Sequence, residues 1–295
     1  MTMTRTTILL MGGFLLLLLS APVCTPEEET PDDLPTITCV EPKDGEVGRS
    51  VRTITSGGLE RTFRLYVPTI YDPSKGHALV FDMHGFGSNM DTQAEVSGYE
   101  EKAEARGFIV VHPQGVEDSW NGGSCCGTAA EQNIDDVGFI SDMIDALSAE
   151  YCIDPRYVFA TGMSNGGFMS HRLGCELADR IAAIGPNAGI IGIENCSPAR
   201  NVPVLQSHGT RDVIVPYEEG VASAETWAEH NGCGEKAVVE EFRDAVCEEY
   251  ADCNEGASVR LCSFSGGHIW PVSNSSNAYD VTDATWAFFK DHPMP

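Results

Sequence analysis

Residues 157–174 read YVFATGMSNGGFMSHRLG. The first five residues are mostly aromatic and β-branched, which is typical of a buried strand, and the last seven favour a helix. Between them, residues 162–166 match the pattern G-x-S-x-G, in which a serine occupies a sharp turn from strand to helix. Side chains two residues before and after that serine would collide, so both positions are glycine. The stretch therefore predicts an α/β fold that exposes Ser164 as a nucleophile.

The rest of the chain repeats this alternation of strand and helix. Strands are expected at residues 63–67, 78–83, 108–112, 181–184, 202–206 and 259–263, and helices at 92–105, 135–151, 168–177 and 283–290. Strands that alternate with helices form a mainly parallel central sheet flanked by helices on both faces. The composition is steady from residue 39 onward, so residues 39–295 are interpreted as one catalytic domain.

A serine nucleophile needs a histidine base, and the histidine needs a carboxylate to orient it. In this class of fold the carboxylate and then the histidine follow the serine along the chain. His268 lies in a glycine-containing loop between the last strand and the last helix, where the base is required. Asp212 lies in the loop after the strand at 202–206, and is the predicted acid. His208 is expected to hydrogen-bond the loop that holds Asp212.

Ester hydrolysis also needs two N–H groups that stabilise the oxyanion of the tetrahedral intermediate. The Asn165 N–H, at the start of the helix after the serine, is the first predicted donor. The second donor is expected from the loop after an earlier strand. The sequence His84-Gly85-Phe86-Gly87 follows the strand at 78–83, so the Phe86 N–H is chosen. The absence of a following Lys-Ser or Lys-Thr pair disfavours a phosphate-binding loop.

Six motifs together resemble the esterase family of polyhydroxybutyrate depolymerases and bacterial feruloyl esterases. They are HGFG (84–87), WNGGSCCG (120–127), DDVGFI (135–140), GMSNGG (162–167), HGTRDVIVPY (208–217) and GGHIWP (266–271). The resemblance implies an exported α/β-hydrolase with Ser164, Asp212 and His268 as its triad. It also implies that Trp120 and Trp270 lie near the substrate pocket, with ordinary packing as the alternative. Asp135 and Asp136 either brace the oxyanion side or act as helix N-terminal carboxylates.

The N-terminus and the cysteines indicate export. Residues 8–19 form an apolar run that is short for a membrane span and suits a signal peptide, assigned to residues 1–24. Cys24 leaves two alternatives open, a lipid-anchored protein or a freely secreted one. Residues 25–38 are interpreted as an acidic linker. The ten remaining cysteines allow five disulfides, with Cys125 and Cys126 expected to pair with different partners and a Cys247–Cys253 loop as one suggestion.

The charge balance narrows the partners. With 18 Lys and Arg against 44 Asp and Glu, the formal net charge is −26, which disfavours binding to nucleic acid or through a basic face to a membrane. No metal-binding spacing appears and no cofactor is expected. The sequence therefore predicts a serine carboxylic ester hydrolase that acts on a small or oligomeric ester, such as a feruloyl ester or hydroxyalkanoate. The alternatives are an acetylxylan-type esterase and a catalytically silent surface binding protein.

Overall fold

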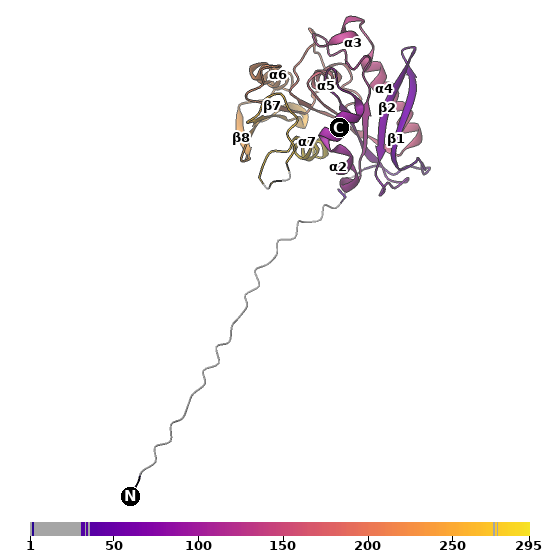
Figure 1. Ribbon diagram of the computed structural model, residues 1–295, viewed down its shortest axis with the longest axis horizontal. Helices are drawn as coiled ribbons and strands as arrows, with labels where there is room; N and C mark the ends of the chain where they lie inside the picture. The colour runs from indigo at the N-terminus through magenta and orange to yellow at the C-terminus, as the bar shows by residue number, and fades with distance from the viewer. Residues whose placement is uncertain (1, 3–30, 33, 35, 274, 276) are drawn as a thin grey trace.

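A ten-stranded sheet forms the centre of the protein. The computed structural model describes residues 2, 31, 32, 34, 36–273, 275 and 277–295. Along the sheet the strand order is β1-β2-β4-β3-β5-β6-β7-β10-β9-β8. The six strands from β4 to β10 run parallel, and an antiparallel hairpin extends each edge. Figure 1 shows the β1–β2 hairpin and β8 at opposite ends of the molecule. The predicted α/β class is confirmed.

The bounds of the elements are as follows. The strands are β1 (Gly48–Ser56), β2 (Leu59–Val67), β3 (His77–Met83), β4 (Ile109–Pro113), β5 (Ile153–Met163), β6 (Ala183–Asn187), β7 (Val204–Gly209), β8 (Lys236–Glu241), β9 (Ala245–Tyr250) and β10 (Val259–Phe264). The helices are α1 (Met90–Ser97), α2 (Tyr99–Arg106), α3 (Gly127–Glu131), α4 (Asp136–Glu150), α5 (Asn165–Glu176), α6 (Tyr217–His230) and α7 (Val281–Lys290), with a single 3-10 turn, η1, at Asn254–Gly256.

Two apolar cores lie on the two faces of the sheet, because successive side chains of a strand point to opposite faces. On β5, Val158 and Ala160 join the core beneath α4, α5 and α6, whereas Tyr157 and Phe159 join the core beneath α2 and α7. The central strands therefore consist of nearly continuous apolar runs, as expected for a sheet covered on both faces. This burial fixes the register of β5, and with it the position at which the strand ends.

Two local predictions differ from the structure. The helix expected at residues 92–105 is two helices, α1 and α2, separated at Gly98. Gly98 has a φ of 66°, a left-handed conformation that ends α1 and that glycine adopts without the steric penalty of a side chain. The strand expected at residues 181–184 is β6, which runs on to Asn187.

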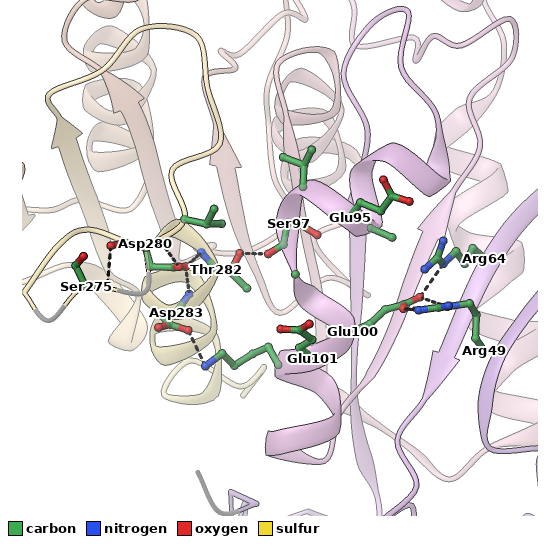
Figure 2. A pocket seen from close by; sticks show the side chains of 16 residues that line it. Arg49, Arg64, Glu95, Ser97, Glu100, Glu101, Ser275, Asp280, Thr282 and Asp283 are labelled. Carbon is green, nitrogen blue, oxygen red and sulfur yellow. Dashed lines mark hydrogen bonds and ion pairs between the residues drawn. The ribbon is translucent and has the colours of Figure 1, made fainter. Parts of the chain in front are cut away.

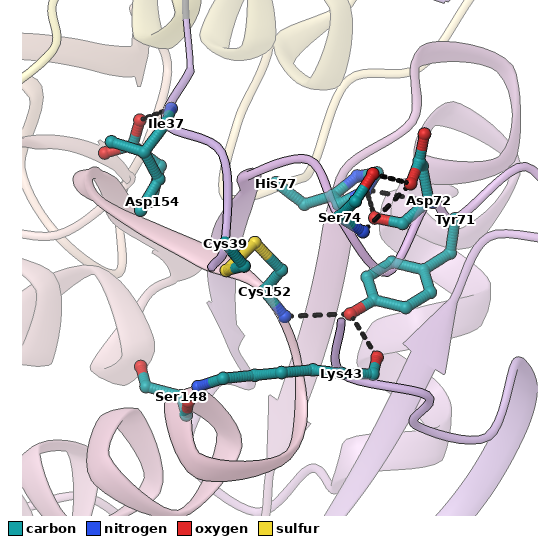
Figure 3. The surroundings of a disulfide bond; sticks show 10 residues. All are labelled: Ile37, Cys39, Lys43, Tyr71, Asp72, Ser74, His77, Ser148, Cys152 and Asp154. Carbon is teal, nitrogen blue, oxygen red and sulfur yellow. Dashed lines mark hydrogen bonds between the residues drawn. A yellow bond between two sulfur atoms is a disulfide. The ribbon is translucent and has the colours of Figure 1, made fainter. Parts of the chain in front are cut away.

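The segment before the domain is docked on it where the structure describes it. Oδ2 of Asp32 accepts a hydrogen bond from Nε1 of Trp286 at 2.7 Å. The Ile37 N–H donates to Asp154 at 2.9 Å, and a disulfide joins Cys39 to Cys152, as Figure 3 shows. Two residues of the segment interpreted as an acidic linker, Asp32 and Ile37, thus contact the body of the domain. The carboxylate of Asp32 accepts a hydrogen bond from Trp286 in the body of the domain.

The ten cysteines after Cys24 form five disulfides. The pairs are Cys39–Cys152, Cys125–Cys126, Cys175–Cys196, Cys233–Cys253 and Cys247–Cys262. Both pairing expectations are wrong. Cys125 and Cys126 bond to each other because their loop folds back on itself, with Gly122 N–H donating to the Cys125 carbonyl and Cys126 N–H to the Trp120 carbonyl. Cys247 faces Cys262 because β9 and β10 pair in that register, which leaves Cys253 for Cys233.

The predicted signal peptide and Cys24 lie outside the described residues, apart from Thr2. Within the part of the chain that the structure describes, no helix has the length and apolarity needed to cross a membrane.

Candidate active site

Ser164 lies at the turn between β5 and α5. Its φ of 53° and ψ of −117° are sparsely populated for a residue with a side chain, and such strain is typical of this turn. A β-carbon on Gly162 would lie 2.8 Å from the carbonyl carbon of Gly166. A β-carbon on Gly166 would lie 2.1 Å from the carbonyl oxygen of Met83. The predicted reason for both glycines is confirmed, since the turn has no room for side chains there.

Asp212 and His268 meet at the ends of two neighbouring parallel strands, β7 and β10. Nδ1 of His268 lies 2.7 Å from Oδ2 of Asp212. The Asp212 side chain is fully buried, and that of His268 is 19% exposed. Oδ1 of Asp212 accepts the N–H groups of Ile214 and Val215, so the carboxylate is fixed by its own loop. This leaves Oδ2 for the imidazole and holds Nε2 of His268 away from Asp212.

Backbone hydrogen bonds connect the acid and histidine loops. Thr210 N–H donates to the Phe264 carbonyl at 2.9 Å, and Arg211 N–H donates to the Gly266 carbonyl at 2.8 Å. His208 supports the same loop, because its Nε2 lies 2.9 Å from the Val215 carbonyl oxygen. Burial lowers the pKa of His208, which keeps the ring neutral. The structural role predicted for His208 is confirmed.

Asn187, at the end of β6, connects the nucleophile to the histidine loop. Its carbonyl accepts the Ser164 N–H at 2.9 Å, and its side-chain amide donates to the Ile269 carbonyl at 2.9 Å. Ile269 directly follows His268. The sequence analysis missed Asn187 because it ended this strand three residues early. The place of Asn187 at the end of its strand could have revealed it, because the strand next to the serine strand ends beside the serine.

The two predicted oxyanion donors flank Ser164. A β-carbon on Gly85 would lie 3.5 Å from Cβ of Ser164, so the loop of Phe86 packs against the serine turn. Asn165 begins α5, where the first N–H groups of a helix have no partner within the helix. Within the described residues, the N–H groups of Phe86 and Asn165 donate no hydrogen bond. Both are therefore free to donate hydrogen bonds to a negatively charged oxygen.

Trp120 and Trp270 are buried, in agreement with the packing alternative and not with substrate contact. Trp120 is 0% exposed, and its Nε1 donates to the His84 carbonyl at 3.0 Å. Trp270 is 6% exposed, and its Nε1 donates to Oγ1 of Thr282 at 3.0 Å. With their ring faces and polar atoms engaged in the interior, neither indole presents a surface to a substrate. The Trp120 indole instead contacts the segment that precedes Phe86, through the His84 carbonyl.

Asp135 and Asp136 both lie at the N-terminus of α4, as the helix alternative expects. Asp135 is the N-cap of α4 and accepts the Gly138 N–H at 2.8 Å. Asp136 is fully buried, forms an ion pair with Arg61 at 2.7 Å and accepts the Asn121 N–H at 2.8 Å. Asn121 directly follows Trp120, so Asp136 braces the loop that carries the Cys125–Cys126 disulfide.

A cavity of about 990 Å³ lies between α1, α2 and residues 272–283, and none of Ser164, Asp212 and His268 lines it. As Figure 2 shows, Glu100 lies between Arg49 and Arg64 and bonds to both. Because no residue of the proposed triad lines it, the cavity is not assigned a role in the chemistry. The described residues also contain no group of His, Cys, Asp and Glu side chains arranged to hold a metal ion.

Residues 68–252 match the family described as phospholipase/carboxylesterase. The chain belongs to this family. The carboxylesterase is 31% identical over 251 residues to feruloyl esterase C of Emericella nidulans, covering 80% of this chain and 87% of that protein. It is 32% identical over 253 residues to feruloyl esterase B of Piromyces equi, covering 77% of this chain and 44% of that longer protein.

Solved structures agree with the fold of this carboxylesterase. The acetyl xylan esterase of Aspergillus awamori superposes with a TM-score of 0.64 at 16% identity, over 82% of this chain and 99% of that one. A ferulic acid esterase of the anaerobic fungus Anaeromyces mucronatus gives a TM-score of 0.55 at 16% identity, over 91% and 96%. At such identities the likeness shows the fold alone. The family and the esterase relatives together make the protein a carboxylic ester hydrolase.

Proposed function

We propose that the protein is an exported serine esterase that acts through an acyl-enzyme on Ser164. The observation that carries this proposal is the 2.7 Å contact between His268 and Asp212. A carboxylate on Nδ1 fixes the tautomer whose Nε2 accepts a proton. The two loops that hold this pair are joined to the serine turn by Asn187.

The proposed reaction has two steps with one base. His268 removes the Ser164 hydroxyl proton as Oγ attacks the ester carbonyl, and the N–H groups of Phe86 and Asn165 stabilise the oxyanion. His268 then gives the proton to the departing alcohol, which leaves an acyl group on Ser164. Water, activated by the same imidazole, releases the acid and restores the serine. The carboxylate of Asp212 stabilises the imidazolium in both steps.

The side chains around these loops favour an acyl group with apolar surface. Phe86 is 59% exposed, Val213 86%, Ile214 68% and Ile269 51%. Each lies within two residues of a proposed active-site group, at the ends of β3, β7 and β10. Exposed large apolar side chains gathered at one site are typical of binding surfaces. We therefore place a feruloyl or hydroxyalkanoate ester ahead of an acetylated sugar, whose acyl group is a single methyl.

Five disulfides support the proposed location outside the cytoplasm, because reducing compartments disfavour them. The esterase relatives named above are consistent with a feruloyl ester as substrate. A freely secreted enzyme and one anchored at Cys24 have the same catalytic chemistry. The only partner that we propose is the ester substrate, and we propose no binding to nucleic acid.

Covalent labelling tests the proposal. A fluorophosphonate should label the wild-type protein and not Ser164→Ala, and the variant should unfold at the same temperature. An unlabelled wild type would indicate a catalytically silent binding protein instead. Initial rates on methyl ferulate, a hydroxybutyrate oligomer and an acetylated sugar then decide the substrate. A faster reaction with the acetylated sugar would favour the acetylxylan alternative and count against the role given to the apolar side chains.

A further inference from the structure

His84 is a buried histidine beside the proposed active site that the reaction above does not use. It is 0% exposed and directly follows β3. Its Nε2 accepts the Gly115 N–H at 3.0 Å, so this nitrogen carries no proton. The other nitrogen, Nδ1, lies 2.8 Å from the Gly85 carbonyl oxygen and must be the N–H donor. Burial lowers the pKa of His84, in agreement with a neutral ring.

This hydrogen bond acts on one particular peptide group. The Gly85 carbonyl belongs to the peptide that carries the Phe86 N–H. In a trans peptide, the C=O and N–H point in opposite directions. The Gly85 carbonyl is held by two donors, Nδ1 of His84 and the Ser88 N–H at 3.1 Å. With the carbonyl turned to the buried ring, the N–H must face the other way, away from His84.

The same loop packs against the serine turn. A β-carbon on Gly85 would approach Cβ of Ser164 to 3.5 Å, so no side chain separates the two segments. Glycines at positions 85 and 87 leave this loop free to rotate its peptide groups, and Gly87 has a φ of 72°. The Ser88 N–H holds the Gly85 carbonyl from within the loop, and His84 adds a second, buried donor.

We propose that His84 is a positioning residue, which orients the Gly85–Phe86 peptide so that the Phe86 N–H faces the oxyanion formed on attack by Ser164. This inference rests on the proposed function. It assigns to His84 no contact with substrate and no proton transfer. The Gly115 N–H selects the tautomer, and the tautomer supplies the donor that holds the peptide.

Two substitutions separate the two hydrogen bonds of the ring. The side-chain amide of asparagine reaches the position of Nδ1, whereas that of glutamine reaches the position of Nε2. His84→Asn therefore keeps a donor for the Gly85 carbonyl and loses the acceptor for Gly115. His84→Gln keeps the acceptor and loses the donor. Both variants remove one buried hydrogen bond, so loss of stability alone does not distinguish them.

His77, at the other end of β3, offers a matched control. Its Nε2 accepts the Asp72 N–H at 3.1 Å, and its Nδ1 lies 2.7 Å from the Gly107 carbonyl oxygen. It thus makes the same pair of backbone contacts far along the strand from Ser164. His77→Gln and His77→Asn should lower the unfolding temperature and leave kcat within about threefold of the wild type.

The experiment measures kcat and KM for 4-nitrophenyl acetate, with the unfolding temperature of each variant. Loss of one oxyanion donor typically lowers kcat by about 100-fold or more. We expect His84→Gln to lower kcat at least tenfold with KM changed less than threefold, and His84→Asn to keep kcat within threefold. Equal kcat losses in the two variants, or no loss in His84→Gln, would overturn the proposal. Should His84→Gln fail to fold, a tenfold loss in a folded His84→Asn overturns it alone. A wild type without esterase activity would instead refute the proposed function.

Discussion

Trp120 and Asn165 are joined by a reciprocal pair of hydrogen bonds. The Trp120 N–H donates to Oδ1 of Asn165 at 2.7 Å, and Nδ2 of Asn165 donates to the Trp120 carbonyl at 3.0 Å. The residue that supplies one proposed oxyanion donor is thus fixed by its side chain to the loop of the Cys125–Cys126 disulfide. The indole of Trp120 also donates to the His84 carbonyl, so one residue contacts both oxyanion segments.

Removal of the Asn165 amide should therefore weaken stability and turnover together. Asn165→Ala keeps its backbone N–H but leaves the buried Trp120 N–H without a partner, at a cost of about 1–3 kcal/mol, whereas the Trp120 carbonyl still accepts from Gly122 and Cys126. We expect kcat to fall about tenfold while KM changes little. Denaturant unfolding and steady-state kinetics check this. Asn201→Ala, which removes only a surface contact with Glu255, is the control. An unchanged kcat in a destabilised Asn165→Ala would show that the pair is purely structural.

Asp212 is the proposed acid of the triad. In Asp212→Asn, Oδ1 can still accept from Ile214 and Val215, but an amide N–H would face Nδ1 of His268. The imidazole then adopts the wrong tautomer, and kcat should fall by about 10³–10⁴-fold. The unfolding temperature should change little. Asp145→Asn, on the exposed side of α4, is the control, and its kcat should match the wild type. A modest, tenfold effect of Asp212→Asn would exclude it as the orienting carboxylate.

The buried ion pair of Arg61 and Asp136 gives a test of stability. Breaking a buried pair leaves one charge without compensation and typically costs about 3–5 kcal/mol. Asp136→Asn keeps an acceptor for the Asn121 N–H but strands the Arg61 guanidinium, which also lies 3.9 Å from the Phe139 ring centre. The double variant Arg61→Met/Asp136→Asn should recover most of that loss. Urea unfolding of the two single variants and the double variant measures the coupling; additive effects would contradict the pairing.

The Cys125–Cys126 and Cys233–Cys253 disulfides should support different properties. Loss of the first should affect kcat more than stability, and loss of the second should affect stability more than kcat. In the loop-closure model, a bridge between adjacent residues contributes only about 1 kcal/mol, and one closing about 20 residues contributes about 3 kcal/mol. Sγ of Cys125 lies 3.7 Å from Nδ2 of Asn165. We therefore expect Cys125→Ser/Cys126→Ser to lower kcat several-fold with little loss of stability. Cys233→Ser/Cys253→Ser should lower the unfolding temperature more and leave kcat unchanged. The reverse pattern would separate the Cys125–Cys126 loop from catalysis.

The Glu100 cluster should make stability depend on acid pH. Burial alone would raise the pKa of Glu100, but hydrogen bonds from Arg64 and Arg49 outweigh it and lower the pKa from 4.5 to about 2. Because the folded pKa is the lower one, this stabilisation is present above pH 4.5 and is lost as the pH falls toward 2.

Urea unfolding of the wild type and Glu100→Gln at pH 6 and pH 2.5 measures this effect. The variant should be less stable by about 2 kcal/mol at pH 6, since the exposed Arg49 end of the cluster is screened by solvent. The difference should shrink at pH 2.5. Glu241→Gln, on the exposed face of β8, should show no such dependence. A difference that stays constant between the two pH values would contradict the low pKa.

The sequence by itself was enough for the class of fold and for the local chemistry of the serine turn. Both depend on neighbouring residues: the alternation of apolar runs with helical stretches, and two glycines that a sharp turn requires. The order of the motifs placed Asp212 and His268 on loops after parallel strands, and the structure brings these two side chains together. The packing of Gly162 and Gly166 against Met83 gives the physical reason for the motif.

Only the tertiary structure decided which buried polar groups support the site. The contacts of Asn187 with Ser164 and Ile269, and of Trp120 with Asn165, join segments that are distant in sequence, and the identity of a residue does not reveal its partner. Disulfide pairing has the same property, since the register of β9 and β10 places Cys247 against Cys262. Burial also decided the roles of Trp120 and Trp270, because an indole suits a pocket and a core equally well until its neighbours are known.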